Sequence, residues 1–199
     1  MTYSGLLMLG VGTALARILF GDRDRLWAAL VVPALAVTIP LTFSRSAEVG
    51  ACAAVALLFL LKDKRLLALL PVVGLIFFVA APTRVTDRFE SIFNLKNPTN
   101  FDRLVMLREG VHMVKDHPVL GIGPNMVLPL YAQYREPDAV NQVNPHLHNV
   151  PLQIAAERGL PALAAWLWFV GALAVSLWKM LWEPVQRLMA ATGLAAVVA

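Results

Sequence analysis

Charge and cysteine are both scarce in this sequence. Only 15% of its 199 residues are Asp, Glu, Lys or Arg, whereas soluble domains average roughly 25%. Its single cysteine, Cys52, excludes a disulfide within the chain. No basic stripe with interleaved aromatic residues is present, which argues against nucleic acid as a partner. Because 58% of the residues are hydrophobic, the composition instead predicts a membrane protein.

Several common catalytic signatures are also missing. The chain has no glycine-rich phosphate-binding signature, no nucleophile-elbow serine and no zinc-protease helix. No acidic pair has the spacing of metal ligands, and a zinc site on His146 and His148 would lack a nearby Cys or carboxylate cluster. We therefore expect no metal and no cofactor.

Long apolar runs divide the chain. A helix needs about 20 apolar residues to cross a bilayer. We expect an all-α polytopic membrane protein, with four transmembrane spans in residues 1–81, a polar loop over 82–158 and C-terminal spans in 159–199. The apolar runs, of which the last is too short to span, are residues 3–20, 26–43, 47–61, 66–81, 160–182 and 188–199.

The short loops give the expected orientation. Residues 21–25 and 62–65 are rich in Lys and Arg and should be cytoplasmic, as should Lys179 and Arg187. The polar loop, residues 82–158, then lies outside the cytoplasm and carries eight basic and eight acidic residues. This orientation places the N-terminus outside without an export signal. We therefore expect the chain to be a piece of a longer polytopic protein.

The polar loop is expected to hold a helix over residues 100–118. Asn100 is a plausible N-cap, and the residue before Pro118 avoids helical geometry. An arginine near the middle of an apolar arc is costly unless it is paired, and Arg103 has this position. It could snorkel or pair with a buried carboxylate, or it could clamp phosphate oxygens bidentately. The other members of the arc are Leu104, Met106, Leu107, Gly110, Val111, Met113 and Val114.

Arg45 is a second unexpected cation. It lies in a very short turn between two expected spans, on the outer face, where basic residues are uncommon. Arg45 could contact lipid headgroups or the nearby Glu48. It could also form an anion site at the membrane surface, with Ser44 and Ser46 as further donors.

The stretch "NPHLHNVP" places titratable groups where the polar loop meets the next apolar run. Pro151 favours the first turn of a helix and Gly159 suits its C-terminal cap, so His148 and Asn149 should lie at the helix N-terminus. Free N–H groups and the helix dipole there favour an anion. The dipole also lowers the pKa of a histidine and keeps the imidazole neutral. The alternative is that His148 is only a capping or interfacial residue.

Together these motifs resemble the O-antigen ligase and polymerase superfamily of bacterial membrane glycosyltransferases. The matching pieces are "TFSRSA" at a span end, then "FDRLVMLREGVHMVKDHPVLGIGPN", then "HLHNVPLQIAAERGLPA" at the start of the last long span. The resemblance covers residues 41–182. It implies a GT-C-like transmembrane helix bundle in the bacterial inner membrane, with a long, helical periplasmic loop. Members of the superfamily carry more spans than this chain.

The resemblance also implies a reaction and a site. A glycan carried on undecaprenyl diphosphate would pass to an acceptor hydroxyl without a metal ion. Arg45 and Arg103 would hold the diphosphate and stabilise its departing charge, and His148 would accept the proton of the acceptor hydroxyl or orient that hydroxyl. The other residues expected to bind substrate or support the site are Asn149, His146, Gly121 and Gly123, the glycines by shaping the tight turn "GIGPN".

Several functions remain open at this point. A ligase would use lipid A–core as the acceptor, whereas a polymerase would use another lipid-linked glycan. Some relatives have been described as transporter-like proteins in bicarbonate uptake, and an inactive fragment is a further alternative. A transporter should show broken helices with polar groups near mid-span. The polar candidates gather instead at the expected outer face, which favours chemistry at the surface.

Overall fold

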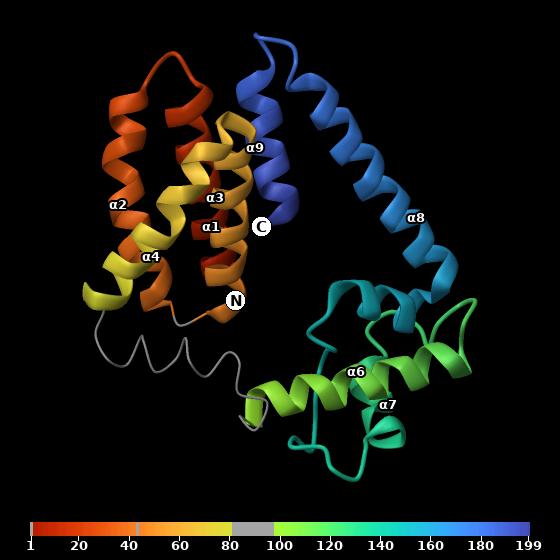
Figure 1. The fold of residues 1–199 in the computed structure, drawn as a ribbon. Coiled ribbons are helices and arrows are strands. Elements are labelled where there is room, and N and C mark those ends of the chain that lie inside the picture. The colour runs from red at the N-terminus through yellow and green to blue at the C-terminus, as the bar shows by residue number, and fades with distance from the viewer. Residues whose placement is uncertain (1, 43, 81–97) are drawn as a thin grey trace. The chain divides into compact units, whose positions relative to one another are not determined.

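The structure is a computed structural model that describes residues 2–42, 44–80 and 98–199 (Figure 1). All regular secondary structure in these residues is helical, which confirms the expected all-α class. The chain divides into two compact units. Unit 1 comprises Met1–Thr86 and Ala172–Ala199, and unit 2 comprises Asp87–Gly171.

The helices of unit 1 follow the expected apolar runs closely. They are α1 (Thr2–Phe20), α2 (Arg25–Leu41), α3 (Arg45–Lys62), the 3-10 helix η1 (Lys64–Ala68), α4 (Leu69–Ala80) and α9 (Arg187–Val198). Unit 2 contains α6 (Pro98–Asp116), α7 (Val127–Tyr134) and the beginning of α8 (Val150–Met180), whose last turns belong to unit 1.

Two of the described helices are long and apolar enough to cross a membrane. They are Tyr3–Phe20, which is nearly all of α1, and α8. Helices α2 and α9 are apolar but shorter. Length and composition thus support membrane spans at two positions. The full set of spans expected from the sequence, and their bundle, stay a prediction.

Small residues hold the helices of unit 1 together. Figure 1 shows α9 beside α1 and α3, and these three helices share one hydrophobic core. A Cβ added at Gly12 of α1 would lie 3.4 Å from the Cβ of Ala195 in α9. Small side chains let helix backbones approach closely, which is typical of helix packing in membranes. The buried members of this core are Ala16, Ala54, Leu58, Ala191 and Ala195.

Basic residues gather at one end of unit 1. The ring centroid of Phe20, at the end of α1, lies 5.4 Å from Nζ of Lys62, at the end of α3. It also lies 5.4 Å from Cζ of Arg187, at the start of α9. The loops expected to be cytoplasmic therefore adjoin one another. This agrees with the orientation expected from their charge, although which side of a membrane they face stays a prediction.

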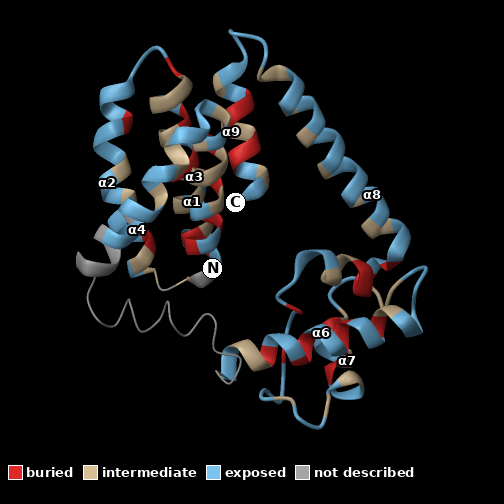
Figure 2. Cartoon of the chain, viewed as in Figure 1, coloured by how far each residue is buried: buried red, intermediate tan, exposed pale blue. Residues whose placement is uncertain are grey.

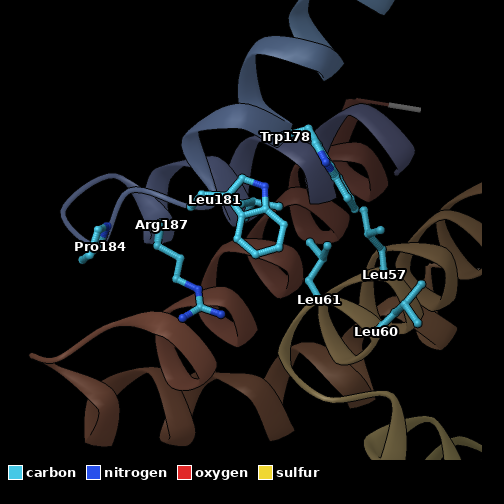
Figure 3. A pocket seen from close by; sticks show the side chains of 8 residues that line it. Leu57, Leu60, Leu61, Trp178, Leu181, Pro184 and Arg187 are labelled. Carbon is cyan, nitrogen blue, oxygen red and sulfur yellow. The ribbon is translucent and has the colours of Figure 1, made fainter.

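An apolar pocket of about 430 Å³ lies near this basic end (Figure 3). Figure 3 shows leucines of α3 on one side of it and Trp178 of α8 on another. Arg187 is its one charged residue, and it holds none of the site residues expected from the sequence. The lining residues are Leu57, Leu60, Leu61, Trp178, Leu181, Trp182, Pro184 and Arg187.

In unit 2, α6 packs against α7 and the beginning of α8. Its core contains the buried side chains of Met113, Val127, Leu147 and Ala156. A Cβ added at Gly110 of α6 would lie 2.5 Å from Cδ2 of Leu152. The absence of a side chain at this position therefore lets α6 and α8 pack at close range.

Only part of the apolar arc expected on α6 is buried (Figure 2). Met106, Gly110 and Met113 are buried, but Leu104 and Leu107 are 43% and 44% exposed. Two carboxylates, Asp102 and Glu109, are buried instead, because polar groups outside α6 provide hydrogen bonds for them. Arg103 consequently lies beside exposed leucines and not in the middle of a buried face.

Candidate active site

The turn into α8 fixes the position of His148. This residue has a φ of 51°, a left-handed conformation that is uncommon for residues other than glycine. Asn149 follows, and its Oδ1 accepts the N–H of Leu152 at 3.0 Å. That bond is the usual contact of a helix N-cap. His148 and Asn149 therefore lie at a helix N-terminus, as the sequence predicts, and the side chain of Asn149 makes the cap.

Gly159 breaks α8 into two helical segments. Its φ of 82° and ψ of 171° belong to a region that is open almost only to glycine. Residues 150–158 therefore form a short helix of their own before the apolar segment begins. The short helix therefore ends at Gly159, where the sequence predicts its end, although a ψ of 171° differs from that of the usual left-handed cap.

The "GIGPN" turn closes the end of this short helix. The N–H groups of Ile122 and Gly123 donate to the carbonyl oxygens of Ala156 and Glu157, at 2.8 Å and 3.0 Å. The last carbonyl groups of a helix have no partner within the helix, so this contact satisfies them. Gly121 has a φ of 68°, and a Cβ there would lie 2.3 Å from the carbonyl carbon of Glu157. Gly121 and Gly123 thus support the site through the backbone.

Residues 141–149, here called the histidine segment, are held from several sides. Leu147 is buried in the core of unit 2, and its N–H donates to Oε1 of Gln153 at 2.8 Å. Gln153 in turn donates to Oε1 of Glu157 at 2.7 Å. The rings of His146 and His148, on either side of Leu147 in the sequence, have centroids 4.3 Å apart and are tilted by 59°. The two imidazoles therefore lie close together but are not stacked face to face.

Arg103 and His148 line the same pocket. It has a volume of about 260 Å³, and Asn149 also borders it. Among the described residues, Arg103 forms no ion pair, so its guanidinium is not committed to a carboxylate of this part of the chain. The remaining lining residues are Asn100, Leu104, Leu107 and Leu147. The pocket therefore combines one permanent cation, one imidazole and a wall of leucines.

The environment of His148 favours a neutral ring. Partial desolvation is the main cause that lowers the pKa of His148, and the charges of His146 and Arg103 lower it further. Asp102 acts in the opposite direction, but the pKa stays below its ordinary value of 6.5. The direction agrees with the sequence expectation, whereas the main cause is desolvation and not the helix dipole.

Arg45 belongs to the other unit of the chain. It is the first residue of α3 in unit 1, and its side chain lies outside what the structure describes. Its convergence with Arg103 and His148 remains a prediction. His146 reaches the site through its ring contact with His148. Within the described ranges, no group of three or more His, Cys, Asp and Glu side chains could hold a metal ion.

A buried polar network that the sequence did not lead us to expect lies next to the pocket. Nδ2 of Asn141 donates to Oδ2 of Asp102 at 2.9 Å. Nδ2 of Asn144 donates to the hydroxyl oxygen of Tyr131 at 3.1 Å, and this hydroxyl donates to Oε1 of Glu109 at 3.2 Å. The available signal was the spacing of Asp102 and Glu109, since residues seven apart lie on the same face of a helix.

Comparison with known protein families gives an assignment that is independent of this geometry. A family model described as O-Antigen ligase matches residues 28–167. The match covers more than half of the chain and includes all seven site residues expected from the sequence. A comparison with curated proteins finds no match.

Proposed function

The chain belongs to the O-antigen ligase family, and on this premise we propose that it transfers a glycan from undecaprenyl diphosphate to an acceptor hydroxyl. Proteins of this family are membrane-associated and glycosyltransferase-like, and their substrates are in general lipid-linked glycans. The proposed acceptor is lipid A–core, on the periplasmic face of the inner membrane.

The composition of the Arg103–His148 pocket carries this proposal. A polyprenyl diphosphate joins a strongly anionic group to an apolar chain, and the pocket offers partners for both. The guanidinium of Arg103 can bind phosphate oxygens bidentately. Leu104 and Leu107 lie beside it and are exposed, so they can contact the first isoprenyl units. We place the diphosphate at Arg103 and the acceptor hydroxyl at His148.

The proposed reaction is a displacement at the anomeric carbon of the glycan. The acceptor oxygen forms a bond to this carbon, and the bond from the carbon to the diphosphate oxygen breaks. The electron pair leaves with undecaprenyl diphosphate, whose growing charge Arg103 stabilises. His148 takes the proton of the hydroxyl, which requires a neutral imidazole. The lowered pKa of His148 supports this role.

The other expected site residues have supporting roles in this proposal. Asn149 fixes the backbone at His148 because it caps α8, and His146 lies against the catalytic ring. Arg45 is proposed as a second cation for the diphosphate. Arg45→Lys should therefore lower transfer, since an ammonium group cannot bind two phosphate oxygens in a fork.

A transfer assay tests the proposal directly. The membrane-embedded protein is given an undecaprenyl-diphosphate-linked glycan and lipid A–core, and both products are measured. Glycosylated acceptor and free undecaprenyl diphosphate should appear in equal amounts. His148→Ala should abolish both, while His117→Ala, which removes an exposed histidine outside the pocket, should not. Transfer at the normal rate by His148→Ala would contradict the proposal.

Polymerisation is the second activity compatible with this pocket, because it differs only in the acceptor. Deletion of the complete gene separates the two. Loss of glycan from lipid A–core while lipid-linked polymer is still made identifies a ligase. Glycans that consist of single repeat units identify a polymerase.

A further inference from the structure

The side chain of Glu109 is fully buried, and only one of its two carboxyl oxygens accepts hydrogen bonds from the described residues. Its Oε1 accepts the hydroxyl of Tyr131 at 3.2 Å and the N–H of Glu136 at 3.1 Å. Its Oε2 is buried and has no hydrogen-bond partner among the described residues. Oδ1 of Asp102, on the same face of α6, is in the same situation. The proposed reaction uses neither carboxyl group.

A buried oxygen without a donor penalises the ionised form of Glu109. Burial of an unpaired charge costs far more than burial of a neutral carboxyl group, so the group tends to keep its proton. Desolvation is the main cause that raises the pKa of Glu109, and the hydrogen bonds from Glu136 N–H and Tyr131 oppose it. The negative charges of Asp102 and Glu136 raise the pKa further.

The charged and titratable groups around Glu109 come from three parts of unit 2. Asp102 and Arg108 belong to α6, Tyr131 to α7 and Glu136 to the segment after α7. The charge of Arg108 also interacts with Glu109, but Arg108 is bound to Asp138 at 2.7 Å on the surface. The negative charges of Asp102 and Glu136 therefore favour the neutral form of Glu109, together with its burial and against the two hydrogen bonds that it accepts.

The network around Glu109 ends on both sides of the candidate active site. The Tyr131 hydroxyl, which donates to Glu109, accepts a hydrogen bond from Asn144, two residues before His146. At the other end Asn141 donates to Asp102, which immediately precedes Arg103. The same contacts thus attach the histidine segment to the helix that carries Arg103.

We propose that Glu109 is a positioning residue, whose carboxyl group keeps its proton in the folded chain and, through Tyr131 and Asn144, holds the histidine segment against α6. The part of this inference that concerns donor binding rests on the proposed function, because there Glu109 keeps His148 opposite Arg103. The attachment of the segment itself does not depend on that function.

The test compares three variants in the full-length chain in detergent. Glu109→Gln replaces the carboxyl group by a neutral group of nearly equal shape and keeps an oxygen for Tyr131. Glu109→Ala removes the acceptor, and Tyr131→Phe removes the hydroxyl alone. Glu183→Gln, which changes an exposed carboxylate of unit 1, controls for net charge.

Hydrogen exchange at neutral pH is the first measurement, and it follows the histidine segment through the amide of Leu147, which donates to Gln153. Protection should be retained in Glu109→Gln and Glu183→Gln. Exchange should be at least about tenfold faster in Glu109→Ala and Tyr131→Phe, since the attachment is lost. If amide exchange is equally fast in Glu109→Gln and Glu109→Ala, the proposal that the carboxyl group of Glu109 is neutral is wrong. Unchanged protection in both Glu109→Ala and Tyr131→Phe would overturn the positioning role. If Glu109→Ala does not fold, Glu109→Gln and Tyr131→Phe decide.

Thermal unfolding across pH is the second measurement. The folded-state pKa of Glu109 is raised above its ordinary value of 4.5, so its stabilising effect is complete below pH 4.5 and is lost as pH rises through the folded-state pKa. Glu109→Gln cannot ionise. As pH rises through this range, the unfolding midpoint of Glu109→Gln should therefore increase relative to that of the unchanged chain. The midpoint of Glu183→Gln should not increase in this way. If the difference in unfolding midpoint between Glu109→Gln and the unchanged chain does not change with pH, the proposal that Glu109 keeps its proton is wrong.

Binding of farnesyl diphosphate, a short polyprenyl diphosphate, separates the two proposals. It should weaken about tenfold in Glu109→Ala and stay unchanged in Glu109→Gln. If the unchanged chain does not bind this probe, the proposed donor site fails, while hydrogen exchange and thermal unfolding still decide the role of Glu109. If the probe binds and Glu109→Ala binds it equally well, the positioning role fails and the donor site stands.

Discussion

His148 and Arg103 border one pocket, although one lies before α8 and the other in the first turns of α6. The charge of Arg103 is among the causes that lower the pKa of His148. The guanidinium that we propose as the partner of the diphosphate thus also helps to keep the neighbouring imidazole unprotonated. This coupling is the reason why both residues are expected to affect the same pH profile.

The rate of transfer should fall on the acid side at a pH below 6.5. A lowered pKa keeps His148 neutral, and able to accept a proton, to a lower pH than an ordinary histidine. His146→Asn removes one cause of the lowering, so the acid limb should move up toward 6.5. The measurement is the rate of transfer between pH 5 and pH 8. A limb that moves down, or does not move, would contradict the assigned electrostatics.

Arg103→Ala should lower the rate of transfer by about 100-fold or more, as is usual when one group that stabilises a developing anion is removed. Arg103→Lys should recover only part of the activity, because it keeps the charge but loses the bidentate contact. Lys115→Ala changes an exposed cation on the same helix, outside the pocket, and should have little effect. Equal losses in Arg103→Ala and Lys115→Ala would indicate a general effect of charge.

Asn149→Ala should destabilise unit 2 by about 1 kcal/mol, because the N–H of Leu152 loses its capping acceptor. Asn149→Ser and Asn149→Asp keep an oxygen that can cap the helix and should retain most of the stability. Chemical denaturation of the detergent-solubilised protein gives the comparison. If serine is as harmful as alanine, the side chain of Asn149 acts by some contact other than the cap.

Gly121→Ala should destabilise the protein by more than about 2 kcal/mol. A left-handed residue other than glycine costs roughly 1–2 kcal/mol, and the new Cβ would also overlap the backbone at Glu157. Gly171→Ala is the matched control, since a Cβ there meets nothing within 4 Å and the position is helical. Unfolding midpoints measure both. A tolerated Gly121→Ala would show that the turn does not close the short helix in this way.

The local structure around the site could be predicted from the sequence. Pro118 marks the end of α6 at Asp116, and Gly159 ends the short helix before the apolar part of α8, whereas the expected N-cap Asn100 lies inside α6, which already includes Pro98. These features depend on neighbouring residues: a proline restricts the residue before it, and only glycine adopts certain backbone angles at low cost. The resemblance of three sequence motifs to the O-antigen ligase superfamily is confirmed by the family model.

The tertiary structure alone decided which side chains of α6 are buried. Helical periodicity grouped Leu104 and Leu107 with the core, but they are exposed, while Asp102 and Glu109 are buried. Burial of a carboxyl group depends on hydrogen-bond donors that come from elsewhere in the chain, here Asn141 and Tyr131. Periodicity within one helix contains no information on such partners, and for the same reason the shared pocket of Arg103 and His148 follows from packing and not from spacing.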